Sequence, residues 1–159
     1  MSNLRKFADG IEKAIANAVN AIVAQEADRI NQEYDLQWGT EINDIRVAYK
    51  AYNGEEATIT GAGTQIAFVE FGTGVTYPDT HPKAAEMGAI RGDYGKGYGK
   101  QKTWGYYGEP EPYAKYRRTT TKGDLYTTHG MPASKTMYYA TVRIKEDLPK
   151  AIKEELNKL

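Results

Sequence analysis

The side chains that could carry chemistry in this sequence are few, and they stand apart from one another. His81 and His129 are the only histidines, and neither has a second histidine at a spacing typical of a metal site. Ser134 lies close to a proline and outside the G-x-S-x-G pattern of a hydrolase nucleophile. No nucleophile, base and orienting group can be assembled from these motifs. We therefore expect no enzyme, no metal ion and no cofactor.

Glu70 is more informative, because it is a charge between two apolar neighbours, Val69 and Phe71. The run 65–71 is apolar enough for a strand packed on a helix, although so short a run could also be helical. On a strand, alternation would place Glu70 on the solvent face. Alternatively, its carboxylate pairs with an arginine or with backbone amides across a subunit boundary. The sequence leaves both interpretations open.

Basic and aromatic residues are interleaved between Lys83 and Lys122, where lysine and arginine outnumber aspartate and glutamate. Tyrosines and Trp104 stand among them, a composition that could stack on bases or neutralise phosphates. A solvated loop, or a loop that folds against a neighbouring acidic surface, would have the same composition. DNA binding is therefore an alternative function and not the leading one.

Composition predicts one domain. The 159 residues, 40% of them hydrophobic, suffice for one compact core over 1–159 and leave little room for a second. Basic and acidic residues number 21 each, so no global charge draws the chain to nucleic acid or to membranes. The absence of cysteine fits the reducing cytoplasm of a bacterium, and the first residues resemble neither a signal peptide nor a spanning helix. We expect a protein that is soluble where it is made.

The elements that position these residues begin with a long helix. Apolar residues recur every three to four positions from near Asn3 to about Tyr34, which predicts an amphipathic helix. Alternation then predicts a hairpin over 44–61, with Asn53 and Gly54 at the central positions of a type I′ turn. The run 65–71 would add a third strand.

Glycine, tyrosine and proline accumulate in the following segment, 75–128. A loop this long inside a compact domain is functional, ordered by a partner or disordered. Within it, residues 102–107 and 113–118 could pair as an extended hairpin. We therefore expect an extended insertion in the domain at about 75–128.

The last element is a helix that begins at Pro132, where proline is favoured, and continues to residue 146. Pro149 interrupts it, so 150–159 is a second helical piece or a kinked continuation. The order of helix, strands, loop and helix predicts an α+β fold, with both helices packed on one side of a small antiparallel sheet.

Two segments resemble a pattern of the tail-component family of tailed bacteriophages. They are residues 66–74, IAFVEFGTG, and residues 130–133, GMPA. Members of this family show an aromatic-V-E-F-G-T segment, a variable loop and a G-x-P-A segment that leads into a C-terminal helix, all behind a long N-terminal helix. The resemblance covers most of the chain, and its specificity comes from the order of the two motifs between helices.

The resemblance implies a structural protein in the neck or tail of the virion, made in the cytoplasm of the bacterial host. Members of the family act in tail completion as a ring, usually six-fold, between the head-closure (adaptor) protein and the tail terminator or tail tube. Double-stranded DNA passes through the ring without sequence-specific binding, and no membrane is involved. The residues implied at the interface with another subunit or partner are Glu70, Phe71, Gly72, Thr73, Gly74, Trp104, Tyr106, Tyr107, Gly130, Met131 and Pro132.

In such an interface, Gly72 and Gly74 would allow the backbone to turn, Phe71 would anchor a buried centre, and Glu70 would specify the register. Three other functions stay open. A tail terminator or minor tail protein would share the ring but bind different partners. A DNA-binding protein would use the basic loop, and an uncharacterised hydrolase comes last.

Overall fold

The computed structural model describes residues 3–38, 44–89, 101–110 and 113–159. The fold is α+β, as the sequence predicts, with helices near both ends of the chain and small antiparallel sheets between them. The chain divides into two compact units. We call Met1–Thr64 with Thr136–Leu159 the helical unit, and Gln65–Lys135 the central unit. The central unit therefore includes the first family-like motif as well as the predicted insertion at 75–128.

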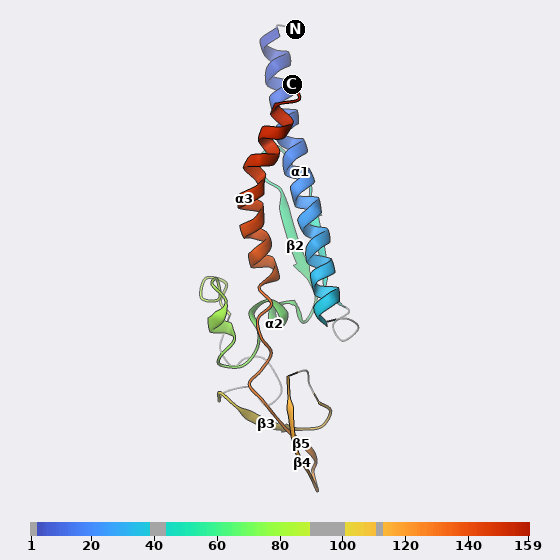
Figure 1. The fold of residues 1–159 in the computed structure, drawn as a ribbon, viewed down its shortest axis with the longest axis vertical. Helices are drawn as coiled ribbons and strands as arrows, with labels where there is room; N and C mark the ends of the chain where they lie inside the picture. Colours follow the sequence, from blue (N-terminus) through green and yellow to red (C-terminus); the bar gives the residue numbers. More distant parts are fainter. Residues whose placement is uncertain (1–2, 39–43, 90–100, 111–112) are drawn as a thin grey trace. The chain divides into compact units, whose positions relative to one another are not determined.

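The helical unit is built on α1 (Asn3–Trp38), which continues beyond the predicted end at Tyr34. Its buried side chains recur mostly every three to five positions, with one adjacent pair, and so share one face. They are Ala14, Ala18, Val23, Glu26, Ala27, Ile30 and Tyr34. α3 (Thr136–Leu156) runs alongside α1 (Figure 1), and its Arg143 places Nη2 2.7 Å from Oε2 of Glu26.

The predicted hairpin is confirmed in the same unit. β1 (Arg46–Lys50) and β2 (Thr58–Ala62) pair antiparallel, with Arg46 opposite Ala62. The side-chain amide of Asn31 on α1 donates to the carbonyl of Val47 and accepts from its N–H, both at 2.9 Å. One side chain thus satisfies both polar groups of a strand residue and holds β1 against α1.

The predicted type I′ turn is wrong. Residues 51–57 connect the strands, and Gly54 has a positive φ of 103° whereas Asn53 does not. Instead, Oδ1 of Asn53 accepts from the N–H groups of Glu55 and Glu56, both at 3.0 Å. Asparagine here forms a turn through its side chain, an alternative that the Asn-Gly pair alone does not exclude.

The start predicted for the last helix is also wrong. α3 begins at Thr136 and not at Pro132, because Lys135 has a φ of 60°, outside the helical region. Pro149 lies inside α3, which continues to Leu156, so residues after Pro149 extend the same helix, as one of the two alternatives from the sequence has it. Pro149 is exposed, so the carbonyl that loses its helical hydrogen bond can bind water.

The central unit begins with a helix and not with the predicted third strand. α2 (Ile66–Phe71) contains the i to i−4 bond from Val69 N–H to the Gln65 carbonyl, 3.1 Å. A run of six residues, five of them apolar, is too short for its periodicity to separate the two structures. The short 3-10 helix η2 (Pro78–Thr80) follows.

Three strands complete the central unit, in the order β3-β5-β4. They are β3 (Trp104–Tyr107), β4 (Lys115–Thr120) and β5 (Gly123–Thr128). The predicted pairing of 102–107 with 113–118 is wrong, because β5 lies between the two. A tight turn ending at Gly123, with a φ of 107°, joins β4 to β5 and makes that pairing local. Residues 90–100 and 111–112 of the predicted insertion lie outside the described residues.

Candidate functional site

The two family-like motifs form one structure within the central unit. Thr73 N–H donates to the Met131 carbonyl at 2.9 Å, and Met131 N–H donates to Oγ1 of Thr73 at 2.7 Å, although these residues are 58 positions apart. Ser134 N–H donates to the Val69 carbonyl at 2.8 Å, and Lys135 N–H donates to the Glu70 carbonyl at 3.2 Å. We call residues 69–74 together with 129–135 the motif junction.

Glycine is required in the motif junction for space as well as for backbone conformation. Gly72 has a φ of 77°, and a Cβ there would lie 2.6 Å from the Met131 carbonyl oxygen. Gly130 has a φ of 95°, and a Cβ there would lie 2.3 Å from the Thr73 carbonyl oxygen. Both contacts are with backbone atoms, which cannot move aside as a side chain does. The glycines of both motifs therefore serve one close approach of two chain segments.

Glu70 pairs with His81 inside the central unit. Oε1 of Glu70 lies 3.0 Å from Nε2 of His81, and the two side chains are only 8% and 3% exposed. The carboxylate does not lie on a solvent face, and its pairing with an arginine or with backbone amides across a subunit boundary stays a prediction. The sequence analysis missed His81 as the partner; a buried carboxylate needs a nearby donor, but the separation of 11 positions carries no signal.

The Glu70–His81 pair resembles the carboxylate and histidine of a catalytic triad. In a triad the second ring nitrogen of the histidine is free to act as a base, but here it accepts a hydrogen bond. Nδ1 of His81 accepts from the N–H of Lys83 at 3.1 Å. The proton on the ring therefore sits on Nε2 and is donated to the Glu70 carboxylate. The ring of Phe71 covers the imidazole, with ring centroids 4.4 Å apart. This histidine holds α2 to the segment after η2, and no nitrogen is left to serve as a base.

The aromatic residues predicted at the interface divide by exposure. Trp104 and Tyr106 on β3 are buried, and the Trp104 ring lies against Gly74, where a Cβ would be 2.9 Å from Cη2. Tyr107 is 47% exposed. Tyr106 also stacks on Tyr126 with centroids 5.8 Å apart. Of these three aromatic residues, only Tyr107 presents a large apolar surface to solvent.

The remaining predicted interface residues differ in the same way. Thr73 and Gly130 are buried, whereas Met131 and Pro132 are half-buried. The structure thus brings most of the predicted residues together, as an internal framework of the central unit. Their contact with another subunit stays a prediction.

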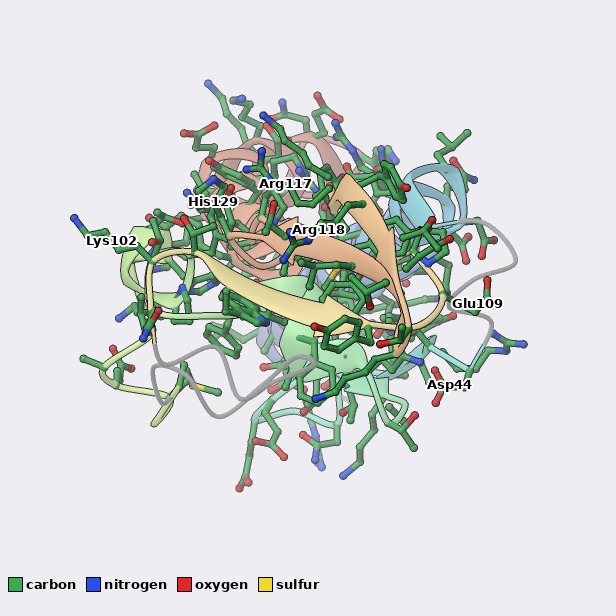
Figure 2. The ribbon with its side chains drawn as sticks, turned by 90° about the horizontal axis from the view of Figure 1, so that it is seen from below. Asp44, Lys102, Glu109, Arg117, Arg118 and His129 are labelled. Carbon is green, nitrogen blue, oxygen red and sulfur yellow. The ribbon has the colours of Figure 1, made fainter. Side chains whose placement is uncertain are left out.

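Basic side chains form a separate surface on β4. Arg118 pairs with Leu125 and Lys115 with Thr127, so one extra residue, Arg117, stands between them as a β-bulge. Nε of Arg117 donates to Oγ1 of Thr127 at 2.7 Å, which puts Arg117 on the same face as Thr127. The bulge thus groups Lys115, Arg117 and Arg118 on one face of the sheet; the two arginines are labelled in Figure 2.

Three tyrosines of this sheet lie on the opposite face, whereas Tyr107 stands opposite Leu125 and so shares the face of Arg118. Tyr126 stands opposite Tyr106 on one side and Tyr116 on the other, and its ring contacts both at 5.8 Å between centroids. The bases of a single strand bind where aromatic and basic side chains share a face. The structure separates most of the tyrosines from the basic side chains, although the sequence interleaves them. The basic face therefore offers three cations for phosphates and one exposed ring, that of Tyr107, for stacking.

Within the described ranges, no group of three histidine, aspartate or glutamate side chains is arranged to hold a metal ion. In the same part of the chain, no helix combines the length and apolar character needed to cross a bilayer. Comparison with protein-family models, curated proteins and solved structures yields no match to this chain.

Proposed function

We propose that this chain is a structural protein of a long-tailed phage virion. In this role it forms a six-fold ring in the neck, between the head-closure protein and the tail, and leaves a channel for double-stranded DNA. The ring performs no reaction. It matches the surfaces of two preassembled parts and holds them together.

The observation that carries the proposal is the motif junction. Each motif alone is short, but Gly72 and Gly130 are positions where any side chain would collide with the backbone of the other motif. Two short patterns that are physically necessary for one structure are better support for a resemblance than two that lie apart. The hydrogen bonds of His81 add support. Both of its ring nitrogens are bonded, one to Glu70 and one to the N–H of Lys83, which favours a structural role for this buried histidine.

The test is to remove the chain from the phage that encodes it. We expect filled heads and separate complete tails by electron microscopy, because only the joint is missing. Cryo-electron microscopy of the intact virion should show density for the chain at the portal vertex. Infectious tailed particles without the chain would contradict the proposal. Tails of irregular length would instead indicate a tail terminator, since a terminator ends growth of the tube.

A second candidate is a DNA-binding protein, favoured by the basic face of β4. Lys115, Arg117 and Arg118 are exposed and could contact successive phosphates. If this were the function, affinity for duplex DNA would fall steeply with salt, and the triple alanine variant would reduce the slope of log affinity against log salt concentration. A neck protein would show no such binding at physiological salt.

A further inference from the structure

The sheet of the central unit has one packed face and one open face. Trp104 and Tyr106 of β3 lie on the packed face and are buried. The open face is the basic face, which carries Lys115, Arg117 and Arg118, and all three side chains are exposed. A sheet that buries only one face in its own unit leaves the other for solvent or for a partner.

The β-bulge gathers the cations of the basic face. In a regular strand, side chains alternate between the two faces, so Arg118 would share the packed face with Tyr116. The extra residue at Arg117 moves Arg118 to the open face instead. Bulges often occur where a strand aims a side chain at a functional surface. The cluster therefore depends on an irregularity of the strand and not on the alternation of the sequence.

Within the described ranges, no anion neutralises the basic face. None of its three cations has a carboxylate within ion-pair distance there. Asp124, the one acidic residue of the three strands, lies on the packed face, where its Oδ1 accepts from Oγ1 of Thr119 at 2.6 Å. Because Nε of Arg117 donates to Thr127, the guanidinium is oriented and both of its Nη groups stay available to an anion.

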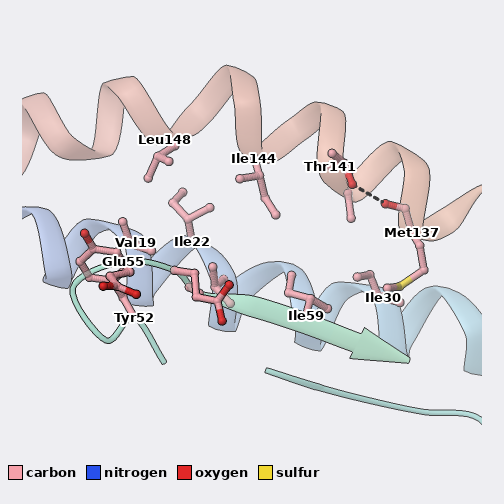
Figure 3. Close-up of a pocket in the computed structure, with 14 residues that line it drawn as sticks. Val19, Ile22, Ile30, Tyr52, Glu55, Ile59, Met137, Thr141, Ile144 and Leu148 are labelled. Carbon is pink, nitrogen blue, oxygen red and sulfur yellow. Dashed lines mark hydrogen bonds between the residues drawn. The ribbon is translucent and has the colours of Figure 1, made fainter. Parts of the chain in front are cut away.

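The basic face fits phosphates better than it fits a protein. Protein interfaces usually have an apolar centre. The helical unit has a surface of that kind, a groove of about 380 Å³ whose lining includes Ile22, Ile59 and Ile144 (Figure 3). On the basic face, only Leu125 among the paired residues is aliphatic, and it is half-buried. Exposed arginine and lysine without an apolar centre are typical of contacts with the DNA backbone.

We propose that the basic face lines the channel of the neck ring and contacts the phosphates of the DNA duplex that passes through it. Arg117 and Arg118 donate to phosphate oxygens through their guanidinium groups, and Lys115 contacts a neighbouring phosphate as a point charge. Every copy presents the same face by the symmetry of the ring, and phosphate contacts carry no sequence information. DNA of any sequence can therefore slide past. This inference rests on the proposed ring and names the surface that faces its axis.

Fluorescence anisotropy with a short labelled DNA duplex tests the contact in solution. Three phosphate contacts per copy predict a slope of about −3 for log affinity against log salt concentration, which is a loss of roughly 40-fold between about 50 and 200 mM salt. The purified protein should thus bind at low salt and not at physiological salt. No binding at low salt would overturn the inference and leave the neck function standing. Binding that persists at physiological salt would also overturn it, because DNA could not slide, and would favour the DNA-binding protein.

Two matched variants locate the contact, since each removes three positive charges. The triple alanine variant of the basic face should lose binding at low salt. The control removes three exposed cations of α3 and should bind like the unaltered protein; it combines Lys145→Ala, Lys150→Ala and Lys153→Ala. If circular dichroism shows that the basic-face variant is unfolded, the milder Lys115→Gln should lower the slope by about 1. Equal binding by the two triple variants, or an unchanged slope in Lys115→Gln, would contradict the inference.

Photo-crosslinking tests the orientation of the basic face in the assembled virion. Tyr107 lies on this face and is 47% exposed, and Tyr139 on α3 is 48% exposed. With p-benzoylphenylalanine at position 107, illuminated virions should give covalent adducts of the protein with DNA, and with the same residue at position 139 few. Equal yields, or adducts from position 107 with a virion protein in place of DNA, would overturn the inference. Absence of the chain from the virion would overturn the neck function itself, whatever the result in solution.

Discussion

In the helical unit, α1 packs through small and aliphatic side chains, such as Ala18 and Ile30, which tolerate small changes in volume. In the central unit, the motif junction depends on backbone hydrogen bonds and on glycines that almost touch the opposite segment. Side-chain packing can adjust, whereas two crossing backbones cannot. Substitutions of similar size should therefore cost more in the central unit, and four experiments can break or sharpen this contrast.

The largest effect is expected for Gly130→Ala. The new Cβ would lie 2.3 Å from the Thr73 carbonyl oxygen at a φ of 95°, and we expect a cost of about 4 kcal/mol or more. Hydrogen exchange should show lost protection at the amides of Thr73 and Met131, with α1 unchanged. Gly123→Ala is the matched control: its φ is 107° but nothing lies within 4 Å, so only the backbone strain of about 1 kcal/mol should appear. Equal costs for the two variants would show that crowding is unimportant.

The next effect is expected for His81→Leu, which leaves the buried Glu70 carboxylate without the donor at 3.0 Å. We expect a loss of about 3 kcal/mol in urea unfolding. The exposed His129 serves as the control. Its Nδ1 lies 2.8 Å from the Lys102 carbonyl oxygen, and losing this exposed hydrogen bond in His129→Leu should cost no more than about 1 kcal/mol. Adding Glu70→Leu to His81→Leu should recover part of the loss, because both polar partners are then absent. If His81→Leu is as stable as His129→Leu, the Glu70–His81 pair contributes little to the stability of the protein.

A smaller effect is expected for Ile30→Val in the helical unit. Ile30 is fully buried at 0% exposure, yet removing one methylene should cost only about 1 kcal/mol. Urea unfolding followed by the helical signal measures it. A cost as large as that of His81→Leu would remove the contrast between the units.

The smallest effect concerns Asp44 in the helical unit. The side-chain hydroxyl of Thr64, followed by its backbone N–H, donates to the carboxylate and lowers the pKa of Asp44 below its ordinary value. A lowered pKa in the folded state stabilises the protein above the ordinary pKa of aspartate, and this contribution is lost as the pH falls through the lowered value. In Thr64→Val, an NMR titration should show the pKa of Asp44 moving back toward its ordinary value. Thr60→Val, also exposed, should leave it unchanged.

The contrast between the units also explains what the sequence could predict. α1 and the β1–β2 hairpin depend on local periodicity, and both were predicted with nearly correct bounds. In the central unit, decisive contacts join distant residues. Met131 bonds to Thr73, and these bonds hold the segment before α3 in a non-helical path, so Pro132 could not start the helix. No local pattern indicates such a contact.

The candidate site shows the same limit. The motif residues were predicted as a set, and the structure joins most of them, but their burial could not be read from spacing. Trp104 and Tyr107 look alike in the sequence, yet one is buried and the other exposed. The bulge at Arg117 likewise depends on β5, which the sequence did not place beside β4.

The interrupted connectivity of the helical unit affects how it is synthesised. The ribosome releases α1 and the hairpin first, then the whole central unit, and only afterwards α3. Until α3 is synthesised, no helix covers the apolar stripe of α1. The nascent chain therefore exposes an apolar surface that is prone to aggregation throughout elongation. A chaperone bound there, or early folding of the central unit as a spacer, would keep unfinished copies from associating before they are complete.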